Sequence, residues 1–171
     1  MIKIFLKYEL LLFPLFVLVQ GCNSHSSFPI GWRSPMNSEM NDDWRKRIPN
    51  KFLKVVGDFN GDKEKDEARL LVNNQDKSIA LFIKYRMDGE NRFFLLEIGD
   101  SLLIHSMGIQ LVKPGKYLTA CGKGYWDCGE DEPPEILLSC DAVDLFIVEG
   151  ANSFIFWDSV DNKFRRIWIS D

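Results

Sequence analysis

The sequence has few of the residues from which enzymes build nucleophilic or metal-assisted active sites. It contains only two histidines, His25 and His105, in 171 residues. It has no Gly-x-Ser-x-Gly turn, His-Glu-x-x-His motif, phosphate-binding glycine loop or dinucleotide fingerprint. We therefore predict no catalytic residues. The alternative is a hydrolase that uses His105, which stands in the apolar stretch LLIHSMG, with acids that the fold brings near it.

The sequence also lacks an excess of basic residues over acidic ones. The chain has 21 lysines and arginines against 25 acidic residues, for a formal net charge of −4. Binding to a phosphate backbone needs a basic face, which this composition does not offer. The sequence therefore argues against nucleic acid as a partner.

The first 21 residues have the pattern of an export signal. Two lysines precede an apolar run from Leu10 to Val19 that is short for a membrane span, and VQGC then ends at Cys22. The stretch resembles a bacterial lipobox, which implies that residues 1–21 are a signal peptide and that lipidated Cys22 anchors the protein to a membrane. The resemblance implies a cell-envelope protein, and because Asn23 follows in place of aspartate, in a Gram-negative host it implies the outer membrane, facing the periplasm. An ordinary signal peptide and an uncleaved anchor remain alternatives.

The next segment, residues 22–41, is polar and interrupted by proline and glycine, which predicts a flexible tether. The stretch NSEMNDDWRKRI starts with the capping residues Asn37 and Ser38, carries acids before bases and ends before Pro49. This order predicts a short helix. One globular domain is expected over residues 42–171.

Beyond Pro49 the chain consists of short runs rich in β-branched and aromatic residues, separated by turn signals such as MDGEN and SVDN. This spacing predicts a mainly β fold, a single antiparallel β-rich domain with a sandwich or barrel-like form. The last two runs, SFIFWDS and KFRRIWIS, carry apolar side chains on both faces. Both faces of that sheet should therefore be covered, by a second sheet or by a helix.

Oxygen-bearing side chains alternate along the stretch DFNGDKEKD. Asp58, Asn60, Asp62 and Asp66 occupy its first, third, fifth and ninth places, and the carbonyl of Glu64 occupies the seventh. Calcium binds carboxylate, amide and carbonyl oxygens, and alternate positions of a tight loop can converge on one ion. The loop therefore predicts a calcium site formed by these five residues.

The loop is not an EF-hand, because Lys63 and Arg69 replace the required glycine and glutamate. The longer stretch GDFNGDKEKDEARLLV instead resembles an FG-GAP or VCBS repeat, in which a D-x-N-x-D-x-x-x-D calcium loop joins two strands. The resemblance implies metal-ligand roles for the same five residues. Lys63 stands where that family commonly has glycine, and the family occurs in tandem copies whereas this chain has one.

The alternative is a plain hairpin turn, in which Asp and Asn side chains bond to their own backbone. Without a cation, Asp58, Asp62 and Asp66 would repel one another and raise one another's pKa, although Lys63 and Lys65 would offset part of that charge. Both interpretations remain open from sequence. A bound calcium ion would stabilise the loop rather than perform chemistry.

Three cysteines follow Cys22, and in an oxidising compartment they allow one disulfide. We predict a Cys121–Cys128 bond, because the intervening GKGYWD is short, and a buried thiol at Cys140. Pairings with Cys140 remain open. Tyr125 and Trp126 lie inside the predicted disulfide loop, beside GEDEPPE, and form a candidate recognition surface for a protein partner. The alternative is that Trp126 packs into the core.

The function that these features predict is a lipid-anchored, non-catalytic binding or structural module with a calcium-stabilised loop. An immunity or inhibitor protein acting on a toxin or hydrolase in the periplasm is the first alternative, and the His105 hydrolase is the second. The C-terminal part of the chain also resembles uncharacterised bacterial lipoproteins, which implies no activity.

Overall fold

The computed structural model describes residues 28–40, 42–46, 51–130 and 132–171. The predicted signal peptide and Cys22 lie outside these residues. The described chain is mainly antiparallel β-structure, arranged as two main sheets and one small sheet. The predicted β-rich fold is therefore confirmed, and its two open sheets give it the form of a sandwich. In the part described, no helix has the length and apolar character that a membrane span requires.

Sheet A holds one half of the sandwich. Its order is β1 (Trp32–Arg33), β3 (Asp66–Asn73), β4 (Ser78–Met87) and β5 (Glu90–Asp100), and β2 (Lys54–Gly57) pairs with the first half of β3. Alternate side chains of these strands point inward because successive residues of a strand face opposite sides. Their apolar inward side chains form one wall of the core.

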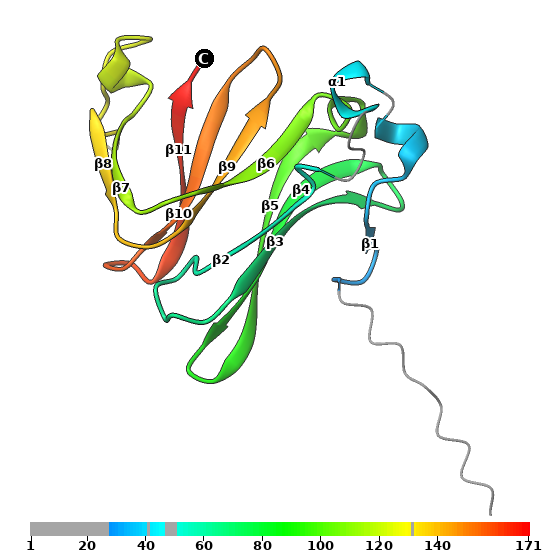
Figure 1. Ribbon diagram of the computed structural model, residues 1–171, viewed down its shortest axis with the longest axis horizontal. Helices are drawn as coiled ribbons and strands as arrows, with labels where there is room; N and C mark the ends of the chain where they lie inside the picture. Colours follow the sequence, from blue (N-terminus) through cyan, green and yellow to red (C-terminus); the bar gives the residue numbers. More distant parts are fainter. Residues whose placement is uncertain (1–27, 41, 47–50, 131) are drawn as a thin grey trace, which may run out of the picture.

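Sheet B faces sheet A across that core (Figure 1). Its order is β11 (Lys163–Ser170), β10 (Asn152–Asp158), β9 (Ala142–Ile147) and β6 (Met107–Val112). Fully buried side chains of both sheets meet here, including Leu70, Leu81, Ile83, Ile109 and Ile155. An aromatic group, Tyr85, Phe94, Trp157 and Phe164, packs between the sheets near β5 and β11.

A third layer covers the outer face of sheet B. The hairpin of β7 (Gly115–Leu118) and β8 (Glu135–Leu138) packs Ile136 and Leu138 against Phe154, Ile167 and Ile169. The prediction that both faces of this sheet are covered is thus confirmed, and a hairpin provides the cover on the outer side. Two 3-10 turns, η2 (Ser101–Leu103) and η3 (Cys121–Lys123), complete this half of the chain.

Both predicted hairpin turns are present. Asp88 and Gly89 have φ angles of 54° and 78° between β4 and β5. Asn162, with φ of 51°, precedes β11 in the β10–β11 hairpin. Asp, Asn and Gly are the residues that adopt left-handed backbone at least cost, which is why the sequence marks these turns.

The predicted N-terminal helix is divided. A 3-10 turn, η1 (Asn37–Met40), and a four-residue helix, α1 (Asp43–Lys46), take its place. The Asp42 carboxylate accepts the Asp43 amide at 2.6 Å immediately before the second piece. Pro49, the predicted end of the helix, lies outside the described residues.

The predicted tether covers residues 22–41, of which the structure describes residues 28–40. For these residues the prediction of a flexible tether is wrong. Trp32 and Arg33 pair with Asn73 and Val72 of β3, and Met40 lies in the core. Backbone pairing and burial hold this polar, proline-containing segment against the sheet, and composition alone did not reveal either.

Candidate metal centre

The stretch Asp58–Asp66 joins β2 to β3 as a tight loop that folds around one carboxylate. Asp58 Oδ1 accepts the Gly61 amide at 2.7 Å, and Asp58 Oδ2 accepts the Lys63 amide at 2.9 Å. Gly61 and Lys63 have left-handed φ angles of 82° and 71°. Left-handed backbone at Lys63 strains a side chain that has a Cβ.

Asn60 and Asp62 continue the pattern of side chains bonded to the loop backbone. Asn60 Oδ1 accepts the Asp62 amide at 3.3 Å, and Asp62 Oδ1 accepts the Glu64 amide at 2.7 Å. Glu64 Oε2 lies 2.9 Å from Arg86 Nη1, so the Glu64 side chain is directed away from the loop. Only the carbonyl of Glu64 remains for a ligand role. For the first half of the loop, the plain-turn interpretation accounts for these contacts.

Asp66 behaves differently from the other loop acids. It is only 2% exposed, its Oδ2 accepts the Phe59 amide at 2.8 Å, and its Oδ1 has no hydrogen-bond partner. Burial raises the pKa of this carboxyl to about 6, and the negative charges of Asp62 and Asp58 act in the same direction. The hydrogen bond from the Phe59 amide opposes that shift, and the nearby Arg86 amide acts in the same direction as Phe59 without a geometric hydrogen bond to Oδ1. A buried carboxylate oxygen without a donor is costly unless a cation or a proton reaches it.

The five predicted ligand residues therefore share one loop without closing into a finished metal cage. Within the described residues, no group of three or more His, Cys, Asp or Glu side chains is gathered tightly enough to hold a metal ion. Asp58 and Asp62 are near enough to act electrostatically on Asp66, but their oxygens are engaged by loop amides. Calcium would have to draw these oxygens together, as hard oxygen ligands in a flexible geometry allow.

The loop also reaches across the sandwich to sheet B. Asp141 Oδ2 accepts the Asp58 amide at 3.2 Å, and Lys113 Nζ lies 3.1 Å from Asp141 Oδ1. The Cys140 thiol donates to the Phe59 carbonyl at 3.4 Å. At the end of β2 a Cβ on Gly57 would lie 2.7 Å from Leu111 Cδ1 and 2.8 Å from Phe59 Cε1, so a larger residue would require these side chains to shift.

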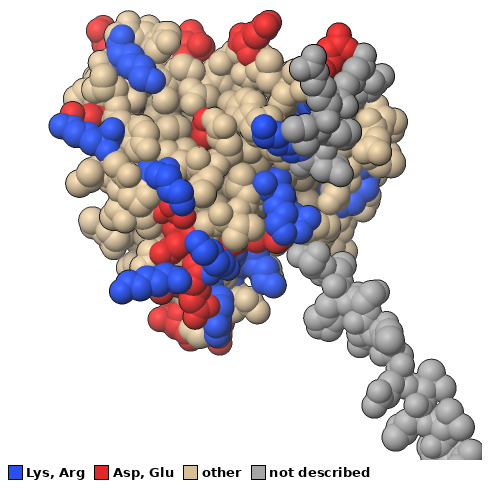
Figure 2. All heavy atoms as spheres, in the orientation of Figure 1, with Lys and Arg blue, Asp and Glu red and all other residues tan. Residues whose placement is uncertain are grey.

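Sequence reasoning missed the residues that hold the loop from the far sheet. Asp141 and Cys140 lie more than 80 residues from their loop partners, with separations of 83 and 81. No local spacing could have marked them. Charged residues surround the loop, and Figure 2 shows basic and acidic side chains interleaved over the lower part of the molecule.

The disulfide forms as predicted. Cys121 is bonded to Cys128, and Cys140 is a buried free cysteine. Within the loop, Tyr125 is 53% exposed, whereas Trp126 is partly buried and donates from Nε1 to Glu132 Oε2 at 2.8 Å. The two residues of the predicted recognition surface therefore differ. Tyr125 faces solvent, whereas Trp126 is hydrogen-bonded to the acidic segment.

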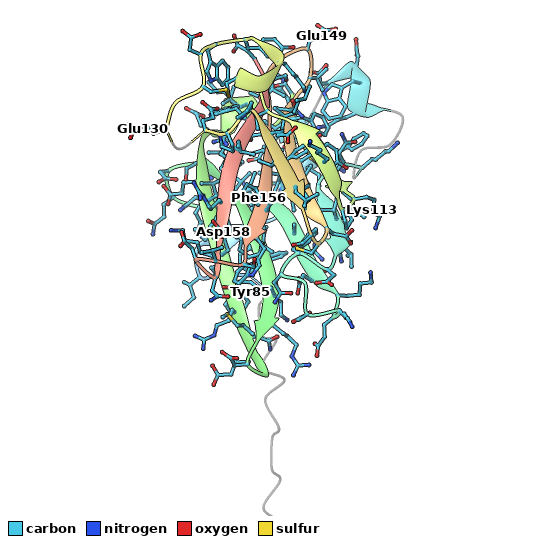
Figure 3. The ribbon with its side chains drawn as sticks, turned by 90° about the vertical axis from the view of Figure 1, so that its left-hand side faces the viewer. Tyr85, Lys113, Glu130, Glu149, Phe156 and Asp158 are labelled. Carbon is cyan, nitrogen blue, oxygen red and sulfur yellow. A yellow bond between two sulfur atoms is a disulfide. The ribbon has the colours of Figure 1, made fainter. Side chains whose placement is uncertain are left out.

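Beside that acidic segment a hollow of about 310 Å³ opens along β11. Its lining residues are Glu130, Pro133, Ile136, Phe156, Arg165, Arg166 and Ile167. Figure 3 shows Phe156 near the middle of this face and Glu130 at its edge. Arg166 packs over the Trp168 ring, 4.1 Å from its centroid, and donates to Ser153 Oγ at 2.9 Å.

His105 is half exposed and does not line this hollow. Its Nδ1 lies 3.3 Å from Asp42 Oδ2. No serine or cysteine side chain in the described chain is hydrogen-bonded to it, so a nucleophile–base pair is not assembled there.

No protein-family model, curated protein or solved structure matches the chain.

Proposed function

We propose that the protein is a lipid-anchored envelope binding module whose β-sandwich is fastened at one end by a calcium ion in the loop Asp58–Asp66. The observation that carries the metal assignment is Asp66. Its buried Oδ1 lacks a donor, and two further aspartates and an asparagine occupy the same loop. A divalent cation would satisfy Oδ1 and offset the repulsion among the three carboxylates.

The ligands in this proposal are side-chain oxygens of Asp58, Asn60, Asp62 and Asp66, with the carbonyl of Glu64. Asp58 is also bonded through its amide to Asp141 on the β8–β9 turn. Calcium would therefore act on the contact between the two sheets as well as on the loop. Binding to the folded form alone stabilises that form in proportion to the logarithm of the calcium concentration.

Calcium titration of the full-length protein by calorimetry tests this assignment. We expect one calcium ion per chain and a melting temperature that rises with calcium and falls in chelator. Asp66→Asn should abolish the heat of binding. Asp76→Asn is the matched control, because Asp76 caps a different turn by accepting the Ser78 amide at 2.8 Å. Absence of calcium binding by the unmodified protein would reduce the loop to a hairpin turn.

The membrane anchor is a separate part of the proposal, and it rests on the lipobox resemblance at Cys22. Replacing Cys22 by serine should move the protein from the membrane fraction to the soluble fraction and prevent incorporation of labelled fatty acid. Unchanged membrane retention with no lipid label would argue for an uncleaved anchor.

A second candidate function is inhibition of a basic hydrolase or toxin. The disulfide loop presents exposed Tyr125, and exposed Asp127 and Glu130 follow it in the chain. A rigid aromatic beside acids suits a cationic protein surface. Purified basic hydrolases should lose activity on adding the protein, and Tyr125→Ala should reverse that loss while calcium binding persists.

A further inference from the structure

The strand β5 forms an open edge of sheet A. It is 11 residues long and pairs only with β4 in the described structure. Between Asn91 and Glu97, none of its backbone groups bonds to a described segment outside that hairpin. A long edge strand with unpaired N–H and C=O groups is a template for another strand, and natural proteins usually block such edges.

The hairpin turn determines which backbone groups are available. Asp88 and Gly89 form a two-residue connection with left-handed backbone, and Met87 and Glu90 are its closing pair. The closing pair of such a hairpin is hydrogen-bonded, and hydrogen-bonded and non-hydrogen-bonded pairs then alternate along the strands. The backbone groups of Asn91, Phe93, Leu95 and Glu97 therefore point away from β4, toward the open side.

The same residues present apolar surface. Phe93 is 58% exposed and Leu95 is 37% exposed, on the outer face of the sheet. Phe93 stacks on buried Phe82, with ring centroids 5.5 Å apart and planes at 18°. Unpaired backbone and exposed apolar side chains thus coincide on one strand, which is the combination that favours pairing over solvation.

We propose that β5 pairs antiparallel with β5 of a second copy of this chain, about a two-fold axis at Phe94. A two-fold axis normal to the sheet keeps each face on the same side, so odd-numbered residues oppose odd-numbered residues. In this register Phe93 lies opposite the partner subunit's Leu95, and Asn91 lies opposite the partner subunit's Glu97. The outward backbone groups then form the hydrogen-bonded pairs.

The pairing of Asn91 with Glu97 favours this register over its neighbours. A shift of two residues in one direction would place Phe93 opposite the partner subunit's Glu97, and a shift in the other would place Asn91 opposite the partner subunit's Leu95. In the proposed register no like charges are directly opposed, and Asn91 can donate from its amide to the facing carboxylate. The ion pair of Arg92 with Glu90, at 3.1 Å, remains within each chain.

Sedimentation of the full-length protein in detergent, over a range of protein and detergent concentrations, tests the proposal. We expect a dimer that dissociates on dilution. Replacing both Phe93 and Leu95 by lysine should give a monomer. Positive charges at positions 93 and 95 of the two copies would then lie directly opposite one another. Leu137→Lys is the control, since Leu137 is 78% exposed on β8, away from this edge.

Position 91, which lies opposite Arg86 within the chain, tests the register. Asn91→Asp would face the partner subunit's Glu97 and weaken the dimer, and Asn91→Lys would strengthen it, each roughly several-fold because symmetry repeats the pair. A protein that is monomeric throughout, or a dimer that survives both lysine substitutions, would overturn the proposed surface. Equal affinities for the two variants at position 91 would overturn the register.

Discussion

The backbone amide of Asp58 donates to Asp141 Oδ2 at 3.2 Å, so the first residue of the candidate calcium loop is bonded to the opposite half of the sandwich. Asp141 is 8% exposed, and its other oxygen faces Lys113 at 3.1 Å. One buried carboxylate therefore joins the β2–β3 loop, the β8–β9 turn and the end of β6. The loop is part of the contact between the sheets rather than a free hairpin tip.

Asp141→Ala should destabilise the fold by about 1–3 kcal/mol, because it leaves the partly buried Asp58 amide without an acceptor. Lys113→Gln should cost less than about 1 kcal/mol, since the Lys113 side chain is 68% exposed and its ion pair is screened. Urea unfolding of both variants measures the difference. Equal losses would mean that the charge pair, rather than the amide contact, carries the stability.

The pH dependence of stability in chelator should reveal Asp66. Its folded-state pKa of about 6 lies above the ordinary 3.8, so the folded protein binds more protons than the unfolded chain between these values. The free energy of unfolding should therefore fall as pH rises from about 4 to 6, by on the order of 2–3 kcal/mol. Asp66→Asn should remove that slope in urea unfolding, and an identical slope in the variant would assign it elsewhere.

Lys63→Gly should stabilise the protein by up to about 1 kcal/mol, because glycine accepts the left-handed φ of 71° without strain. Lys63→Gln separates backbone from charge, since it keeps the strain and removes the ammonium group. Unfolding of the three proteins in saturating calcium gives the comparison. A gain for glutamine equal to that for glycine would attribute the effect to charge.

Loss of the Cys121–Cys128 bond should lower stability by about 2 kcal/mol, the value expected for a short closed loop. The paired Cys121→Ser, Cys128→Ser variant and the reduced native protein should agree in thermal melting. Calcium binding should persist in both, because the disulfide lies outside the loop Asp58–Asp66. A simultaneous loss of calcium binding would show that the two regions unfold together.

Local patterns predicted much of this fold because local chemistry determines it. Asp88 and Gly89 turn the chain between two alternating runs, and Ile167 and Phe164 face opposite layers as their positions in the strand require. The spacing of the loop acids alone marked them as candidate calcium ligands. Spacing could not mark Asp141, because its role depends on a contact between residues far apart in sequence. The segment around Trp32 was misassigned for the same reason: its partner is Asn73, and its composition resembles that of a linker.

With the proposed lipid anchor, the pairing of β1 with β3 would also limit how far the domain can move from the membrane. If Cys22 carries lipid, the short stretch from Cys22 to Phe28 spans at most about 20 Å even when fully extended. The domain would then stay within a thin shell next to the bilayer. Any partner would have to enter that shell, and two anchored copies would meet by lateral diffusion rather than through the bulk periplasm.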